Sequence, residues 1–408
     1  MKKTSRDVKQ GGIKLVSWSG TSGYALAALD YLRGLVAEHI PVYWVPLCDG
    51  ATGVQPWTPA LGMEALNFFP AFAGDSAHAD LPQLLAQCCQ PRDYDTVLVH
   101  LPPEYWPVYF EPGRHNIGFT AWETDRLPPH WTSLLNLADR VLVPSQMNRD
   151  VMQRGGVVVP VDVIPHMLRA VPPPAAPDRR VQCRAALGIG PDTTVFYSIN
   201  TWEPRKGNYD LLRAFAQAFS AADDVLLILK PSLRGIGPPP SFAIEPVAAL
   251  LQKWRQRAAQ QRNDGLPAIR LIDGNLSGTQ IEELHCGGDI SVSLTRGEGW
   301  GMSACEALAR GRPVLMTGFG GQLDYLGADW PWLVNYRMTQ VTPWPNQSSF
   351  LASQRWAQAD IGNAAQLMRQ LHHDLPAAMA LAAPATAALA ERLSMQRVTQ
   401  QLLESLNA

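Results

Sequence analysis

Short apolar runs alternate with longer stretches of helical periodicity along most of the chain. Several runs are almost continuously apolar, which is typical of strands that are covered on both faces. In the first half we expect strands at residues 13–18, 41–46, 96–100, 116–121, 140–143 and 161–164. In the second half we expect strands at 194–199, 225–229, 269–272, 289–294, 313–316 and 332–334. Strands that alternate with helices predict parallel sheets and an α/β fold.

The segments between these runs repeat apolar residues at helical spacing. In residues 208–222, Leu and Phe recur on one face, so we expect an amphipathic helix there. Residues 302–310 predict a short helix, because Gly311 follows it and can end it. About the last 50 residues are rich in Ala, Gln and Leu and are expected to be helical.

A proline-rich stretch, AVPPPAAPDRR at residues 170–180, separates the two series of strands. Consecutive prolines favour an extended, semi-rigid connector. A chain of 408 residues also exceeds one ordinary core. We therefore expect a first domain at 1–170, a second at 171–390, and a C-terminal helix at 391–408 that can cross back to the first domain.

Composition and charge exclude some classes of protein. Apolar residues make up 46% of the chain and charged residues 17%, which suits a packed core. The formal net charge is −2, so there is no basic excess to bind a nucleic-acid backbone. The six cysteines lack metal-ligand spacing, and we interpret them as buried thiols of a reducing compartment.

No segment has the features of a membrane span or a signal peptide. The start has lysines but no apolar stretch behind them. The best apolar candidate, 377–393, is mostly alanine, and we expect Pro384 to interrupt it. We therefore expect a cytoplasmic protein, and peripheral association with the inner face of a membrane is compatible with this sequence.

The most informative segment is TRGEGWGMSACEALARGRP, residues 295–313. Its glycines let the backbone approach a ligand, and the amides at the start of the following helix suit a diphosphate. Glu298 lies in the loop and Glu306 lies eight positions later. Ser303-x-x-Glu306 also matches a helix capping box, and Glu298 also reads as a solvated loop carboxylate. The residues alone leave both interpretations open.

Two adjacent cations follow the expected strand 194–199. Arg205 and Lys206 lie in a turn before a helix that Gly207 opens. Such a pair at a strand-to-helix turn suits a diphosphate, although a solvated pair in a polar loop is the commoner arrangement.

The first half carries three weaker signals. Gly23 lies in a glycine turn after the first strand, but the turn lacks the third glycine of a dinucleotide fingerprint. Trp122 and Glu123 follow the expected strand 116–121, where Trp122 can pack and Glu123 can cap a helix near Pro128. His100 ends the run 96–100, and a lone histidine at a strand end is more often structural than catalytic.

The segment from Glu298 to Glu306 resembles the E-x7-E signature of the retaining GT-B glycosyltransferases of family four. The flanking residues match as well, namely Glu306-Ala307-Leu308-Ala309, Gly311, Pro313-Val314, and Gly320-Gly321 before Asp324. The resemblance covers about residues 13 to 330. It implies two Rossmann-like domains whose parallel sheets face each other across a cleft, with the donor bound mainly to the second domain.

The resemblance also implies roles for the donor site. Glu298 would hold the hydroxyls of the donor sugar, and Glu306 would hold the ribose. The backbone amides implied at the sugar are those of Gly299, Trp300, Gly301 and Met302. Lys206 matches the family's diphosphate turn, whereas Asn200 stands where the family usually has an arginine. Either Arg205 supplies that charge or the diphosphate is held with one cation fewer.

In the first domain the resemblance implies further contacts. Gly23 corresponds to a glycine loop that approaches the donor phosphates. Trp122 and Glu123 stand where many members carry a histidine that meets the sugar. The acceptor-side candidates are therefore His100, Trp122 and Glu123, and the catalytic candidates are Glu298, Lys206 and Glu123.

The implied reaction is transfer of a sugar from a UDP or GDP sugar to an acceptor hydroxyl with retained anomeric configuration. The acceptor would be a sugar, a lipid-linked or a protein-linked molecule, in bacterial polysaccharide, glycolipid or glycoconjugate assembly. No cofactor or metal is expected, because no D-x-D triplet follows the carboxyl end of an expected strand, and Lys206, Arg205 and a helix N-terminus can stabilise the leaving diphosphate. A front-face mechanism is implied, and a double displacement through Glu298 or Glu123 stays open.

Two alternatives to a transferase also stay open. One is another enzyme on the same scaffold, either a phosphorylase or a nucleotide-sugar epimerase that uses Glu123 with His100. The other is a sugar-nucleotide-binding protein without catalysis.

Overall fold

The computed structural model describes residues 7–50, 53–66, 78–168, 177–232, 245–343 and 348–408. These residues form two compact units. Unit 1 comprises the described residues up to 168 together with 391–408, and unit 2 comprises those from 177 to 390. The expected connector at 170–180 lies mostly outside the described residues.

The sheet of unit 1 has seven strands in the order β3-β2-β1-β4-β5-β6-β7. They are β1 (Ile13–Trp18), β2 (Val42–Gly50), β3 (Gly53–Pro56), β4 (Thr96–His100), β5 (His115–Phe119), β6 (Arg140–Val143) and β7 (Val161–Val163). All neighbours run parallel except β2 and β3, which form an antiparallel edge. The central strands β1 and β4 are buried along nearly their whole length, which explains their continuous apolar runs.

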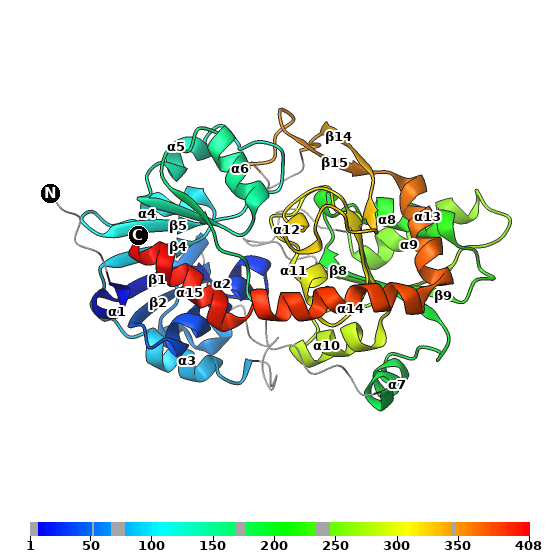
Figure 1. Ribbon diagram of the computed structural model, residues 1–408, viewed down its shortest axis with the longest axis horizontal. Helices are drawn as coiled ribbons and strands as arrows, with labels where there is room; N and C mark the ends of the chain where they lie inside the picture. The colour runs from blue at the N-terminus through cyan, green and yellow to red at the C-terminus, as the bar shows by residue number, and fades with distance from the viewer. Residues whose placement is uncertain (1–6, 51–52, 67–77, 169–176, 233–244, 344–347) are drawn as a thin grey trace. The chain divides into compact units, whose positions relative to one another are not determined.

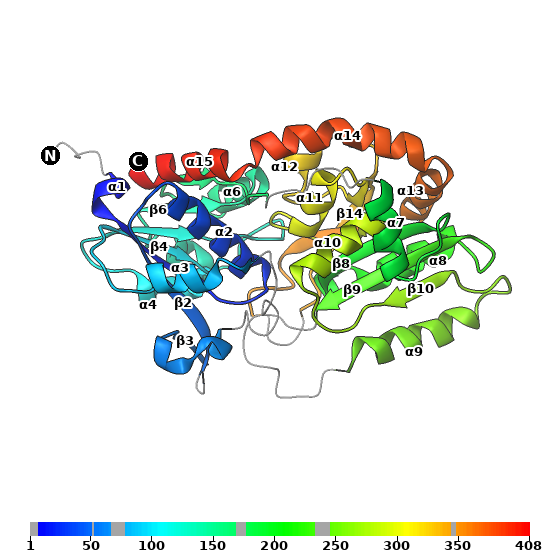
Figure 2. The same ribbon diagram turned by 90° about the horizontal axis from the view of Figure 1, so that it is seen from below.

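Helices cover the sheet of unit 1. They are α1 (Val8–Gly11), α2 (Gly23–Ala37), α3 (Leu81–Cys88), α4 (Trp106–Tyr109), α5 (Trp131–Leu135), α6 (Gln146–Arg154) and α15 (Met395–Asn407), with 3-10 turns η1 (Pro59–Leu61), η2 (Met63–Ala65) and η4 (Pro103–Tyr105). The C-terminal helix α15 lies beside α2 in both ribbon views (Figures 1 and 2). Its apolar face, including Val398 and Leu402, belongs to the same core as Leu15 of β1 and Leu32 of α2. The last helix of the chain therefore completes the core that the first strand begins.

The sheet of unit 2 has six parallel strands in the order β10-β9-β8-β11-β12-β13. They are β8 (Thr194–Thr201), β9 (Val225–Ser232), β10 (Ala268–Leu271), β11 (Ile290–Ser293), β12 (Val314–Thr317) and β13 (Leu333–Val334). A separate antiparallel pair is formed by β14 (Tyr336–Gln340) and β15 (Arg355–Ala359).

The helices of this unit are α7 (Pro177–Ala186), α8 (Asn208–Ala218), α9 (Val247–Ala259), α10 (Gly278–Gly287), α11 (Met302–Ala309), α12 (Leu323–Leu326), α13 (Ile361–His373) and α14 (Leu375–Arg392, whose last two residues belong to unit 1), with the 3-10 turn η5 (Pro204–Lys206). Phe215 of α8 packs edge-on against Phe196 of β8, with ring centroids 5.6 Å apart. This contact explains the apolar stripe of the helix expected at 208–222, which ends at Ala218.

Each of the twelve expected strands corresponds to an observed strand, with ends that shift by at most a few residues. The sequence interpretation missed β3, β14 and β15, because these strands are short, antiparallel and partly exposed and carry no apolar run. Two proline-based expectations were wrong. Residues from Pro177 onward belong to α7 rather than to an extended connector, since proline is well tolerated in the first turn of a helix.

Pro384 does not interrupt its segment, because α14 runs through it from Leu375 to Arg392. The helix buries the small residues Ala378 and Ala382, and the Thr386 hydroxyl donates to the Leu308 carbonyl of α11 at 2.8 Å. Packing thus holds α14 together across the hydrogen bond that a proline removes. No helix in the described part of the chain is long and apolar enough to cross a membrane.

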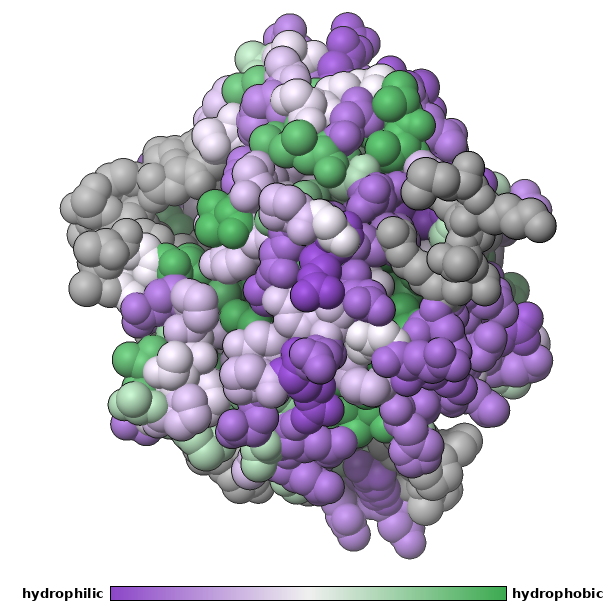
Figure 3. Space-filling model, turned by 90° about the vertical axis from the view of Figure 1, so that its left-hand side faces the viewer, coloured by the Kyte–Doolittle hydropathy of each residue, from purple (hydrophilic) through white to green (hydrophobic). Residues whose placement is uncertain are grey.

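The six cysteines lie within the described residues as free thiols, and five of them are buried. The face of the molecule shown in Figure 3 is mostly hydrophilic, and its apolar residues lie in small separate groups.

Each sheet reverses its strand order at one point, between β1 and β4 in unit 1 and between β8 and β11 in unit 2. In open α/β sheets, ligands bind outside the carboxyl ends of the strands at this switch point. The order of unit 2 is that of dinucleotide-binding sheets. The strand order therefore indicates a ligand site at the loops that follow β8 and β11.

Candidate functional site

Two turns meet at the switch point of unit 2. The turn η5 follows β8, and the loop 294–301 follows β11. The Arg296 amide donates to the Arg205 carbonyl at 2.7 Å and ties the two turns together. Gly207 has a φ of 63°, and a Cβ there would lie 2.0 Å from the Leu294 carbonyl oxygen. Only glycine therefore allows this close approach.

The approach brings the expected charged residues into one cluster. Lys206 Nζ lies 2.6 Å from Glu298 Oε1, and Arg205 Nη1 lies 3.5 Å from Glu298 Oε2. Arg205 also donates to the Gly297 carbonyl at 2.8 Å and to Glu203 Oε1 at 2.6 Å. Glu298 is 8% exposed, so this carboxylate is a buried partner of two cations and not a solvated loop residue.

Two opposing effects set the charge of Glu298. Burial raises the pKa of its carboxyl group, and the nearby charges of Lys206 and Arg205 lower it. Hydrogen bonds from Lys206 and Thr295 add to the lowering, and the net result is a pKa below the usual value. Glu298 is therefore ionised near pH 7. A diphosphate that bound to Lys206 and Arg205 would compete with this carboxylate for their donors.

The helix α11 begins directly after the loop. Its N-cap residue is Gly301, with a φ of 87° and no side-chain cap. The Tyr325 hydroxyl donates to the Gly301 carbonyl at 3.0 Å, and the Gly321 amide donates to the Glu298 carbonyl at 2.8 Å. The loop from Gly299 to Met302 is thus held by α12 and the glycine pair before it. The amides of a first helical turn lack intrahelical acceptors and suit an anion.

The capping-box alternative for Glu306 was wrong. Ser303 is the second residue of α11 and not its cap, and its hydroxyl donates to the Ile199 carbonyl of β8 at 2.9 Å. The Glu306 side chain is 23% exposed and lies with Oε2 3.8 Å from Nε2 of His285 on α10. Glu306 therefore does not complete a cap, and its carboxylate is partly open to solvent.

Asn200 lies near the end of β8, and its amide donates to the Ser198 hydroxyl at 3.0 Å. The side chain is half-buried. Arg205, rather than a residue at position 200, provides the second cation beside Glu298.

Two of the candidates in unit 1 lie at its own switch point. Gly23 is the exposed first residue of α2, after the turn that follows β1. His100 ends β4 and is 2% exposed, with its ring 5.4 Å from that of Tyr24 and 4.6 Å from that of Phe119. Burial, together with the neighbouring His166, lowers the pKa of His100 to about 3. Its ring is therefore neutral near pH 7.

The other two candidates follow β5. Trp122 is 2% exposed, packs edge-on against Trp131 at 4.6 Å and donates from its indole to the Arg126 carbonyl at 2.8 Å. The packing interpretation of its side chain is thus the one that the structure shows. Glu123 is half-buried, and the cap residue of α5 is His130, so Glu123 does not cap that helix.

Three residues of unit 2 that lie close to these turns and helices were missed from the sequence. Tyr325 holds Gly301 as described above. Lys230 near the end of β9 is 7% exposed and donates to the Pro231 carbonyl at 3.2 Å, and burial lowers its pKa. His285 is fully buried behind Glu306. A lysine directly after an apolar run was a usable signal for Lys230, but nothing local pointed to Tyr325 or His285.

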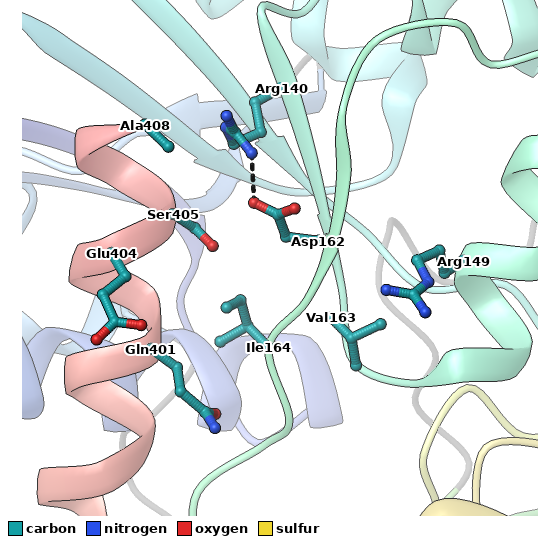
Figure 4. A pocket seen from close by; sticks show the side chains of 9 residues that line it. All are labelled: Arg140, Arg149, Asp162, Val163, Ile164, Gln401, Glu404, Ser405 and Ala408. Carbon is teal, nitrogen blue, oxygen red and sulfur yellow. Dashed lines mark hydrogen bonds and ion pairs between the residues drawn. The ribbon is translucent and has the colours of Figure 1, made fainter.

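A separate open pocket of about 450 Å³ lies within unit 1, between β6, β7 and α15 (Figure 4). Arg140 at this pocket is paired with Asp162. None of the residues expected at the donor or acceptor site lines it. Among the described residues, no group of three or more His, Cys, Asp or Glu side chains is placed to hold a metal ion.

No protein-family model matches the chain. No curated protein matches it either. Solved structures do match along nearly the whole length. Anabaena HepE in complex with UDP and glucose has a TM-score of 0.63 at 17% identity, with 98% of this chain and 100% of that chain covered. Sucrose-phosphate synthase from Thermosynechococcus elongatus has a TM-score of 0.66 at 13% identity, with 97% and 98% covered.

A glycosyltransferase from Rickettsia africae has a TM-score of 0.65 at 13% identity, with 97% of each chain covered. These neighbours share the GT-B fold of glycosyltransferases, and the expected α/β class with two parallel-sheet domains is confirmed. At these identities the likeness establishes the fold alone.

Proposed function

We propose that the chain is a retaining glycosyltransferase of family four that moves a sugar from a UDP or GDP sugar to an acceptor hydroxyl. The observation that carries this proposal is the cluster of Lys206, Arg205 and Glu298 at the switch point of unit 2. The cluster stands at the N-terminus of α11, where both a diphosphate and a sugar hydroxyl find partners.

Each group in the cluster has a distinct task. Lys206 and Arg205, with the amides of the first turn of α11, bind the diphosphate and stabilise the charge that it gains on departure. Glu298 exchanges these cations for the hydroxyls of the donor sugar when the diphosphate arrives. Glu306 accepts hydrogen bonds from the ribose. The amides from Gly299 to Met302 line the sugar, and Gly23 approaches the phosphates.

The chemistry requires no metal in this proposal, since two cations and a helix N-terminus serve the leaving group. The leaving phosphate accepts the proton of the attacking hydroxyl on the same face of the sugar, which retains the anomeric configuration. His100 and Glu123 are the acceptor-side residues of unit 1. The acceptor is a sugar, a lipid-linked or a protein-linked molecule in polysaccharide, glycolipid or glycoconjugate assembly, handled in the cytoplasm or at the inner face of the membrane.

A thermal-shift panel of UDP, GDP and their sugars tests the proposal. A ligand that binds only the native state raises the melting temperature by mass action. UDP and UDP-glucose come first, because the neighbour HepE was solved with both. A shift with one nucleotide, followed by transfer from its sugar to an acceptor with retained configuration by NMR, is the expected result. Absence of any shift would contradict the proposal.

The same assays separate the alternatives. Turnover of the donor without an acceptor, giving an epimeric sugar, would identify a nucleotide-sugar epimerase. Saturable donor binding with no turnover across acceptor classes would identify a non-catalytic binding protein.

A further inference from the structure

A buried polar chain connects the sheet of unit 2 to Glu306. The hydroxyl of Tyr197 on β8 lies 2.9 Å from Nδ1 of His285 on α10. The other ring nitrogen, Nε2, lies 3.8 Å from Oε2 of Glu306 on α11. Tyr197 and His285 are fully buried, whereas the Glu306 side chain is partly exposed. The series Tyr197, His285 and Glu306 therefore leads from the core of unit 2 to the carboxylate that the proposed function assigns to the ribose.

The surroundings determine which nitrogen of His285 carries the proton. Burial lowers the pKa of His285, so the ring is neutral near pH 7 and bears a single N–H. A lone pair facing the Glu306 carboxylate would be repelled, whereas an N–H there is attracted. With the proton on Nε2, Nδ1 accepts the hydrogen bond from the Tyr197 hydroxyl.

Within the described residues, His285 Nε2 meets no hydrogen-bond acceptor at bonding distance. An unsatisfied buried N–H is unfavourable, and an apolar side chain at this position would avoid that cost. The Glu306 carboxylate is close enough to be oriented by the N–H, and a small rotation of its side chain brings the two atoms into hydrogen-bonding range.

We propose that His285 is a positioning residue for nucleotide binding, whose Nε2–H orients the Glu306 carboxylate toward the ribose while Tyr197 holds the ring. This inference rests on the proposed function, which gives Glu306 its ribose partner. A neutral imidazole suits the task, because it aligns the carboxylate without cancelling its charge. Glu306 thus remains a strong acceptor for the ribose hydroxyls.

The test compares two amides at position 285 by calorimetric titration with UDP and with GDP. The asparagine of His285→Asn places its amide near Nδ1, keeps a partner for Tyr197 and offers nothing to Glu306. The glutamine of His285→Gln reaches the position of Nε2 and retains a donor for Glu306. We expect His285→Asn to weaken nucleotide binding by about 3–10-fold, the net worth of one hydrogen bond, and His285→Gln to stay within about twofold of the wild type.

A double-mutant cycle with Glu306→Ala, which removes the acceptor facing His285 Nε2, separates positioning from general stability. If His285 acts through Glu306, His285→Asn has no further effect on affinity in the Glu306→Ala background. The melting temperature of the nucleotide-free protein, measured in parallel, accounts for any purely structural loss. Tyr197→Phe removes one hydroxyl and is used where a His285 variant fails to fold. We then expect a loss of affinity that vanishes in the Glu306→Ala background.

Wild-type affinity in His285→Asn, equal losses in the asparagine and glutamine variants, or additive losses with Glu306→Ala would each overturn the inference. If the His285 variants do not fold, unchanged nucleotide affinity in Tyr197→Phe would overturn the inference instead. A wild-type protein that binds neither UDP nor GDP contradicts the proposed function itself, and that outcome is distinct from a failure of the variants alone.

Discussion

The two sheets reverse strand order in the same way, but the side chains gathered at the two switch points differ in chemistry. In unit 2 the loops after β8 and β11 bring Lys206, Arg205 and Glu298 into one buried cluster of charges. In unit 1 the ends of β1 and β4 and the start of α2 bring together the rings of Trp18, His100 and Tyr24. One site is built from ion pairs and the other from neutral rings.

The cluster of Trp18, Tyr24 and His100, here called the neutral site, also has polar atoms without hydrogen-bond partners among the described residues. Within the described part of the chain, Trp18 Nε1 and His100 Nδ1 are buried without a hydrogen-bond partner. Neutral donors and acceptors of this kind suit hydroxyl groups, whereas paired charges and helix amides suit a diphosphate. One strand order can therefore carry different side chains at its switch point, because the loops and not the strands supply them.

The largest expected effect concerns the carboxylate of the charged site. Glu298→Gln should lower turnover of the nucleotide sugar by about 10–1000-fold, because one polar contact in the transition state is lost. Binding of UDP or GDP without a sugar should be kept or tightened, since Lys206 and Arg205 lose a competing partner. Steady-state kinetics and calorimetry measure the two quantities.

Glu203→Gln is the matched control for Glu298→Gln. Glu203 also forms an ion pair with Arg205, at 2.6 Å, whereas Lys206 pairs with Glu298. We expect near-normal turnover in this variant. Full turnover in Glu298→Gln would show that the Glu298 carboxylate is not needed for sugar transfer. The proposed glycosyltransferase would then lose its strongest support.

The second effect concerns the cation. Lys206→Ala should weaken binding of the nucleoside diphosphate by about 1.5–3 kcal/mol, the range for a hydrogen bond to a charged group. Arg205→Ala should cost less unless Arg205 replaces the cation that is absent at Asn200. Lys253→Ala is the control, because that lysine of unit 2 is 60% exposed. Unchanged affinity in Lys206→Ala, measured by calorimetry, would place the diphosphate elsewhere.

The third effect concerns the neutral site and pH. The pKa of His100 falls from 6.5 to about 3 on folding, so the unfolded chain binds the proton more readily. Its contribution to stability is complete above pH 6.5 and is lost as the pH falls from 6.5 toward 3. Between pH 6.5 and 4.5 this amounts to about 2–3 kcal/mol for one such group.

His100→Gln should remove that part of the pH dependence. Urea unfolding at a series of pH values measures it, and the two stability curves should converge as the pH falls. His373→Gln, at an exposed position at the end of α13, is the control. Parallel curves for His100→Gln and the wild type would show that His100 is not buried as a neutral ring.

The smallest expected effect is that of a chelator. Because the charged site supplies its own cations, transfer should continue in excess EDTA at the untreated rate. The assay is turnover of the nucleotide sugar with and without EDTA. If EDTA abolished activity and Mg²⁺ or Mn²⁺ restored it, the cations Lys206 and Arg205 would not be sufficient to stabilise the charge of the leaving diphosphate.

Much of the fold was predictable because apolar runs and helical stripes are local patterns. The runs at 13–18, 96–100 and 140–143 match β1, β4 and β6 from end to end. The strands β14 and β15 were missed, because they pair only with each other, are partly exposed and carry no apolar run. The interruption expected at Pro384 was wrong, because tertiary packing stabilises a helix that this proline alone would break.

The sequence by itself determined two parallel-sheet domains and the residue types of the charged site, since glycine loops, an Arg-Lys turn and two spaced glutamates are readable in order along the chain. The tertiary structure alone decided their partners. Lys206 and Glu298 are 92 positions apart, and Tyr197 and His285 are 88 apart. Ser303 matched a capping box, yet β8 supplies the carbonyl that its hydroxyl reaches. A local pattern specifies which groups are present, but only the order of the strands determines which of them meet.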